Sequence, residues 1–259
     1  WLRNLVEAGL IPPGEVDERS IADVRPKDLE GFDQCHFFAG IAGWPHALQL
    51  AGWPSTEPVW TGSCPCQPFS VAGSRMGEED ERHLWPEFFR LIKECRPAAV
   101  FGEQVASPLG RSWLDGVFTG LESENYSCGA AIIGAHSLGA PHVRNRIFWV
   151  ANAAGVQRET GAEICGVFSE VRGDGPVANK SDGPSEAFWA SSVSIPCLDG
   201  KARRIGPGIM PLANGIPARV GKIRAFGNAI VPPIAAKFIM ACGLRPEDHR
   251  NSKDGNEGV

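Results

Sequence analysis

A cysteine between a proline and a glutamine is the residue best suited to chemistry in this sequence. Cys66 lies in Thr61-Gly-Ser-Cys-Pro-Cys-Gln-Pro-Phe-Ser70, which predicts a loop after a short strand. The reactive form of cysteine is the thiolate, and nearby positive charge lowers the pKa of a thiol enough to form it. Arg144 and Arg146, later in the chain, are candidates for that charge. We therefore take Cys66 as a candidate nucleophile.

Other chemistries find less support in the sequence. Cys64 and Cys66 form a Cys-x-Cys pair, but no second pair and no His-x-x-x-His lies at metal-ligand spacing, so we expect free thiols and no metal. A nucleophile elbow, a Gly-Lys-Ser phosphate loop and a His-Glu-x-x-His helix are all missing. These absences argue against serine hydrolases, nucleoside triphosphatases and zinc proteases.

Three more polar residues stand where strands are expected to end. Glu103 follows the predicted strand 98–102, and a carboxylate at the end of a central strand suits acid–base work, although a surface glutamate gives the same pattern. Arg144 and Arg146, two residues apart and close to His142, should share one face of a strand. There they could clamp a phosphate or a carboxylate, or lie on an exposed edge.

The elements that must position these residues alternate between strand and helix. Cys35-His-Phe-Phe-Ala-Gly-Ile-Ala-Gly43 predicts a strand and a glycine turn, and Pro45 suits the first turn of a helix. Strand, glycine turn and helix can hold a nucleotide, although a plain turn looks the same. Only Pro54-Ser-Thr-Glu-Pro58 then precedes the strand at Val59, which leaves no room for another βα unit.

Further apolar periodicity predicts helices over 84–95 and 113–121 and strands over 126–133 and 146–151. The fold class is therefore α/β, with a mainly parallel sheet and helices on both faces, shortened by the loss of one βα unit. A small irregular lobe follows, where the composition changes. The expected divisions are an N-terminal arm of surface turns (1–34), a catalytic domain (35–151), an irregular lobe (152–220), a return to the catalytic domain (221–242) and a polar tail (243–259).

Composition restricts the partners and the setting. With 259 residues and 43% hydrophobic composition, one core with an appendage is expected. The net charge of −5 gives no general attraction to nucleic acid, so a DNA contact needs a local basic patch. Positions 200–226, with Arg203 and Arg204, contain no acidic residue and could form it, unless they are a solvated rim. Eight scattered cysteines without a secretory leader predict the cytoplasm, and a start at Trp1 is typical of a fragment.

Taken in order, these segments resemble the DNA cytosine-5 methyltransferase family. The resemblance rests on Phe38-Ala-Gly-Ile-Ala-Gly43, Pro65-Cys-Gln-Pro-Phe-Ser70, Glu103-Gln-Val105, Arg144-x-Arg146 and Gly227-Asn228. It covers residues 35–151 and 221–241. It implies a Rossmann-like catalytic domain, a target-recognition region in 152–220, and a compact, phage-like enzyme of a bacterial or phage-infected cell, of the kind found in restriction-modification systems.

The resemblance also implies roles for single residues. Cys66 would attack C6 of a flipped cytosine in DNA, Glu103 would hold and protonate N3, and S-adenosylmethionine would give a methyl group to C5. Arg144 would steady the base and Arg146 the surrounding geometry. The cofactor would lie against Phe38, Ala39, Gly40, Ile41, Ala42, Gly43, Asn228 and Ala229, and the substrate against Pro65, Gln67, Ser70, Arg203 and Arg204. We expect a DNA-binding monomer with no membrane contact.

Several positions depart from the family pattern. Ala42 replaces the second glycine of the turn, and Gln104 replaces an asparagine. In the family, the missing βα unit carries the acidic residues that bind the ribose and adenine, so Glu57 or Trp60 would have to serve instead. Two alternatives stay open: the Cys66 attack could serve another one-carbon donor or deamination, or the chain could be a silent DNA-binding relative. The presence of both Cys66 and Glu103 speaks against the second.

Overall fold

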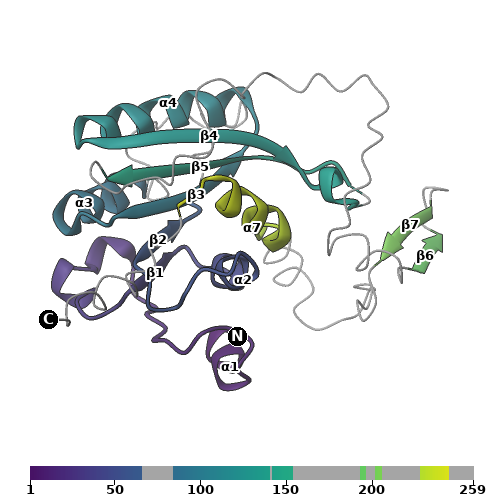
Figure 1. The fold of residues 1–259 in the computed structure, drawn as a ribbon, viewed down its shortest axis with the longest axis horizontal. Helices are drawn as coiled ribbons and strands as arrows, with labels where there is room; N and C mark the ends of the chain where they lie inside the picture. Colours follow the sequence, from purple (N-terminus) through teal and green to yellow (C-terminus); the bar gives the residue numbers. More distant parts are fainter. Residues whose placement is uncertain (66–83, 141, 154–192, 197–201, 206–227, 245–259) are drawn as a thin grey trace, which may run out of the picture.

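The computed structural model describes residues 1–65, 84–140, 142–153, 193–196, 202–205 and 228–244. Within these ranges a five-stranded sheet has the order β1-β2-β3-β5-β4 (Figure 1). Its strands are β1 (Gln34–Phe37), β2 (Val59–Gly62), β3 (Ala99–Val105), β4 (Tyr126–Gly134) and β5 (Asn145–Ala153). β1, β2 and β3 are parallel, whereas β5 is antiparallel to both neighbours, so four strands share one direction. The predicted mainly parallel α/β fold is confirmed.

The connection between β1 and β2 is as short as the sequence predicts. It contains helix α2 (Gly43–Leu50), and residues 51–58 form neither helix nor strand. β1 pairs with β2 in register, Gln34 opposite Val59 and Phe37 opposite Gly62. β1 is consequently the edge strand of the described sheet, and no further βα unit lies between it and β2.

Helices cover both faces of the sheet, also as predicted. α2 and α7 (Pro232–Ala241) lie on one face, and α3 (Trp85–Cys95) and α4 (Pro108–Ser123) on the other (Figure 1). Neighbouring strand residues point to opposite faces. Phe101 and Phe148 therefore pack with α2 and α7, while Val100 and Trp149 pack with α3 and α4.

Local sequence sets where these helices begin and end. Pro86, Pro108 and Pro232 stand in the first turns of α3, α4 and α7, where a missing N–H costs nothing. The Ser107 hydroxyl accepts a hydrogen bond from the Gly110 N–H, 3.1 Å away, and caps α4. Arg96 ends α3 in the left-handed conformation, with φ of 53°.

The N-terminal arm contributes more to the core than its composition predicts. It forms α1 (Leu2–Glu7) and the short 3-10 helices η1 (Ile21–Asp23) and η2 (Pro26–Asp28). Ile21 and Val24 are buried against the α3 side of the core, so the expectation of surface turns alone is wrong. Apolar side chains spaced within a charged segment leave no period that reveals them.

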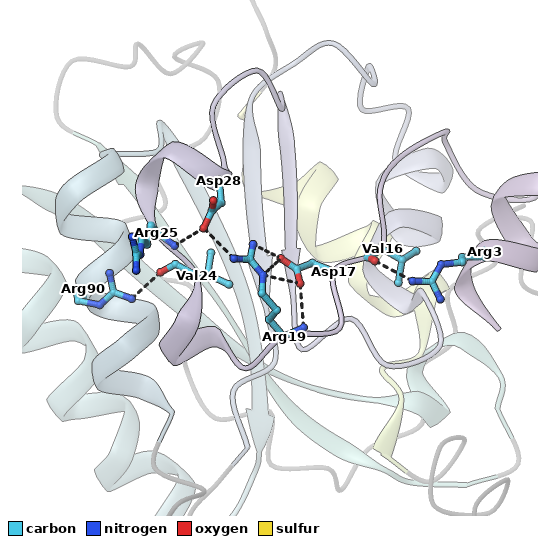
Figure 2. A network of polar contacts seen from close by, with 8 residues as sticks. All are labelled: Arg3, Val16, Asp17, Arg19, Val24, Arg25, Asp28 and Arg90. Atoms are coloured by element: carbon cyan, nitrogen blue, oxygen red, sulfur yellow. Dashed lines mark hydrogen bonds and ion pairs between the residues drawn. The ribbon is translucent and has the colours of Figure 1, made fainter.

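Polar contacts fasten this arm (Figure 2). Arg19 pairs with Asp17 at 2.7 Å and with Asp28 at 3.1 Å, and Asp28 accepts from the Arg25 backbone N–H. Arg90 of α3 donates to the Val24 carbonyl oxygen at 2.9 Å. This last bond ties the arm to α3, because the other contacts in Figure 2 lie within the arm.

Part of the predicted irregular lobe is described. β6 (Val193–Pro196) and β7 (Ala202–Ile205) form an antiparallel pair in which Arg203 is opposite Ile195 and Arg204 opposite Ser194. Figure 1 shows this pair apart from the main sheet. Most of 152–220 and of the tail 243–259 lies outside the described residues. None of the helices in the described ranges has both the length and the apolar character needed to cross a membrane.

A partly buried histidine on β1 predicts acid sensitivity. His36 Nδ1 lies 2.8 Å from Thr61 Oγ1, and burial lowers the pKa of His36 to about 4. In the unfolded chain His36 has its ordinary pKa of about 6.5, so between about pH 4 and 6.5 the unfolded chain binds a proton that the folded protein does not. The free energy of unfolding is therefore unaffected by His36 above pH 6.5. It falls as the pH drops toward 4, by about 2–3 kcal/mol at pH 4.5. Urea unfolding of His36→Gln should show a smaller loss between pH 7 and 4.5 than the exposed control His46→Gln; equal losses would contradict this.

Candidate active site

Glu103 lies inside a strand, not after one. It is the fifth residue of β3 and is 7% exposed. The register that sets Gly62 opposite Gly102 brings Ser63, which follows β2, level with Glu103. The glycine turn follows β1 at the same edge, because the three strands are parallel. The carboxyl ends of β1, β2 and β3 therefore gather the predicted site, as expected for an open α/β sheet.

The Glu103 carboxyl is buried and held by donors. Arg146 Nε lies 2.8 Å from Glu103 Oε1, and the Ser63 hydroxyl, level with Glu103 just after the neighbouring strand, also lowers the pKa of this side chain. Burial raises the pKa of Glu103, while Arg146, Arg144 and Ser63 oppose that rise. Because burial dominates, this carboxyl can carry a proton closer to neutral pH than a surface glutamate can. It has the properties of a general acid.

The two arginines reach Glu103 by different routes, which corrects the prediction of a shared strand face. Arg146 is on β5, but Arg144 precedes that strand and has φ of 33°, outside extended geometry. Arg144 Nη2 donates to the Ala229 carbonyl oxygen at 2.6 Å. Both arginines still act on Glu103, since each lowers its pKa. The alternation rule therefore selects the two arginines that act on Glu103, although they do not share a strand face.

The loop that leads to Cys66 is anchored beside Glu103. Gln104 is 3% exposed, and its Nε2 donates to the Cys64 carbonyl oxygen at 3.3 Å. Its Oε1 accepts from the Val105 N–H at 2.9 Å, which fixes the amide orientation. Pro65 is the last described residue here; Cys66, Gln67 and Ser70 lie outside the described residues. The predicted nucleophile thus follows directly on a segment bonded to β3.

The glycine turn between β1 and α2 has an unusual backbone. Phe38, Gly40 and Ala42 have φ values of 54°, 55° and 71°. Alanine in this region costs about 1–2 kcal/mol relative to its usual conformations, which explains why glycine suits position 42. A Cβ on Gly43 would stand 2.6 Å from Ile230 Cγ1. Ile230 therefore packs on the turn, two residues after Asn228.

Two residues expected at the cofactor are not brought to this turn. Glu57 precedes β2, at the opposite end of the strand from Ser63, and four strand residues span about 13 Å. Its carbonyl oxygen accepts from Trp53 Nε1 at 3.2 Å. The Trp60 ring packs on Phe37 and Phe88 and is 6% exposed, so it offers little surface to an adenine. We correct both assignments.

Three other residues complete the site and were not predicted as members of it. Trp44 is the second residue of α2 and donates through Nε1 to Ser63 Oγ at 3.0 Å. Ser63 acts on Glu103. Gln104 is bonded to the Cys64 carbonyl oxygen, in the segment that leads to Cys66. The sequence does contain one signal for Ser63: it directly follows the carboxyl end of a parallel strand, where site residues gather. Nothing in the described ranges groups three or more His, Cys, Asp or Glu side chains in a way that could hold a metal ion.

Comparison with known proteins agrees with this geometry. Residues 59–170 match the family model described as C-5 cytosine-specific DNA methylase. The chain is 37% identical over 95 residues to the Type II methyltransferase M.AplI of Arthrospira platensis, covering 36% of this chain and 28% of that protein. It is 33% identical over 114 residues to M.NgoMIV of Neisseria gonorrhoeae, covering 43% of this chain and 36% of that protein. The chain thus spans about a third of the length of these relatives.

Solved structures show the same similarity at lower identity. A DNMT2 mutant of Spodoptera frugiperda is 14% identical with a TM-score of 0.41, over 50% of this chain and 52% of that one. A putative DNA modification methyltransferase encoded in an E. coli prophage is 17% identical with a TM-score of 0.39, over 51% and 49%. The fold of the chain itself is of the mixed α/β kind. The match to the family model and these Type II methyltransferase relatives support a relation of this chain to the DNA cytosine-5 methyltransferase family.

Proposed function

We propose that this chain is a DNA (cytosine-5)-methyltransferase that acts through a covalent Cys66 adduct. The observation that carries this proposal is the buried Glu103 carboxyl, paired with Arg146 and set beside the anchored segment that leads to Cys66. The family match supports the substrate class.

The roles of the residues follow from the chemistry of cytosine. Its C6 becomes electrophilic when N3 gains a proton, and Glu103 supplies that proton because burial raises its pKa. The Cys66 thiolate attacks C6, which makes C5 nucleophilic. Arg146 fixes the Glu103 carboxyl, and Arg144 adds positive charge beside the base. After methylation, loss of the C5 proton restores the ring and frees the Cys66 thiolate.

The glycine turn fits part of the proposed cofactor. S-adenosylmethionine, when bound, supplies an electrophilic methyl group. Left-handed residues at positions 38, 40 and 42 precede the N-terminus of α2, and a helix N-terminus after such a turn suits a carboxylate. Asn228 and Ala229, which precede the Ile230 side chain packed on Gly43, are proposed to complete this end of the site. No carboxylate for the ribose stands beside the turn in the described ranges, so we assign only the amino-acid end.

DNA is the proposed partner, with the target cytosine flipped out of the duplex to reach Cys66. Pro65, Gln67 and Ser70 of the Cys66 loop are the proposed contacts to that nucleotide. Arg203 and Arg204 on β7 are proposed to contact phosphates, in a target-recognition region over 152–220.

The test is direct. We expect the purified chain, incubated with random-sequence duplex DNA and S-adenosylmethionine, to produce 5-methylcytosine measurable by mass analysis of nucleosides. Duplexes that carry 5-fluorocytosine should trap the protein covalently, because fluorine cannot leave C5 as a proton does. Cys66→Ser should abolish trapping, and the matched variant Cys64→Ser should retain it.

Different failures point to different conclusions. Equal loss of trapping in both cysteine variants would remove Cys66 as the nucleophile. Trapping without 5-methylcytosine, accompanied by another modified base or by uracil, would favour a different donor or deamination. Neither trapping nor product would indicate a silent relative.

A further inference from the structure

We propose that Trp44 and Ser63 form a hydrogen-bonded relay that orients the Glu103 carboxyl, and that both are positioning residues for proton transfer to the base. The inference rests on the proposed function in one respect only, the role of Glu103 as the acid. The relay itself is a property of the free protein and can be measured without DNA or cofactor.

The direction of the relay follows from its donors. Trp44 Nε1 is a donor only, and it lies 3.0 Å from Ser63 Oγ, so the serine oxygen is the acceptor. The single hydroxyl proton of Ser63 is then available for the Glu103 side chain, which the pairing of β2 with β3 sets level with Ser63 and whose pKa Ser63 lowers. A donated hydrogen bond favours the ionised carboxylate and opposes the effect of burial.

The surroundings make this chain of bonds rigid. Trp44 is 2% exposed, and its ring packs with Phe101 at 6.4 Å and Phe148 at 6.3 Å between ring centroids. Ser63 is held level with Glu103 by the pairing of β2 with β3. Arg146 Nε pairs with Oε1 of the same carboxyl at 2.8 Å. Two donors, Arg146 and Ser63, would thus restrict the orientation in which Glu103 receives and delivers its proton.

The relay also joins two parts of the site. Trp44 immediately follows Gly43, the residue on which Ile230 packs. Ser63 immediately precedes Cys64, whose carbonyl is bonded to Gln104. A bond between Trp44 and Ser63 therefore fixes the glycine turn relative to the segment that carries Cys66. Both residues act through Glu103 and its neighbours.

The experiment measures the titration of Glu103 by carbon-13 NMR of glutamate-labelled protein, with the signal identified by its loss in Glu103→Gln. We expect Ser63→Ala to move this titration to higher pH, and Trp44→Phe to move it in the same direction by less. The controls are Ser127→Ala, an exposed serine on β4, and Trp53→Phe, whose indole donates to Glu57 and packs on Phe101. Arg144 and Arg146, the charged groups that act on Glu103, are unchanged in all four variants.

A double variant separates a relay from two independent effects. In Ser63→Ala, the Trp44→Phe change should shift the Glu103 titration no further, because the bond between them is already lost. A full additional shift, or no shift in Ser63→Ala beyond that of its control, would overturn the relay.

In the methylation assay, the rate falls at alkaline pH, and in Ser63→Ala this fall should occur at a higher pH. A uniform loss of rate at every pH would mean a structural role only. Absence of methylation in the unmodified chain would refute the proposed function and leave the NMR result intact.

Discussion

Glu103→Gln should lower the rate of methylation by about 100- to 10,000-fold, the range typical for removal of a general acid. Glutamine keeps the shape of the side chain but has no proton to deliver to N3. The loss corresponds to about 2.7–5.4 kcal/mol of transition-state stabilisation. Single-turnover methylation of random-sequence DNA is the measurement, and the covalent trapping rate on 5-fluorocytosine should fall in parallel, because the attack on C6 depends on the same proton.

The methylation rate should also depend on pH in a direction that Glu103 sets. If Glu103 must be protonated, the rate in the unmodified chain falls as the pH rises through its pKa, which burial has raised. The residual rate of Glu103→Gln should lack that fall. Glu122→Gln, on the exposed side of α4, is the matched control and should keep both the rate and the profile. A Glu103→Gln rate within tenfold of the unmodified chain, in a protein that still melts cooperatively, would exclude Glu103 as the acid.

The framework of this site was predictable because strong local signals agree with the fold. β2 begins at Val59, as its sequence predicts, and Gly40, with φ of 55°, stands where the backbone turns after β1. The apolar periods of α3 and α4 match the faces they bury. Carboxyl ends of parallel strands converge, so the turn, the cysteine loop and Glu103 could be placed at one edge from order alone.

What the sequence did not reveal depends on contacts between distant residues. Trp44 and Ser63 are 19 positions apart, and Arg144 and Ala229 are 85 apart, so neither bond leaves a local pattern. Arg144 lies just outside its strand, which no alternation rule detects. Glu57 was assigned by proximity in sequence to a missing segment, whereas the direction of β2 carries it to the opposite edge. Pairing and strand direction decided these positions.

Gly102→Ala should destabilise the protein by roughly 3 kcal/mol, near the upper end for overpacking in a core. A Cβ at this position would stand 2.1 Å from Trp149 Cε2 and 2.2 Å from Trp149 Cζ2, and the Trp149 ring is fully buried. The ring cannot move aside easily, because it also packs edge-on against Trp85. The midpoint temperature of thermal unfolding should fall by roughly 6–12 °C. Since Gly102 precedes Glu103, the methylation rate should fall as well.

A second substitution tests whether this overlap is the cause. Trp149→Phe removes the indole atoms that the new methyl group would meet, together with Nε1, which is buried without a partner in the described part of the chain. Alone it should destabilise by leaving a cavity, but combined with Gly102→Ala it should recover part of the lost stability, because the methyl group fills that cavity. Gly116→Ala is the matched control: position 116 is exposed on α4 with open space around its Cβ, and alanine there should stabilise by about 0.5–1 kcal/mol. Strictly additive losses in the double variant would mean that Gly102 is required for its backbone and not for the room it leaves to Trp149.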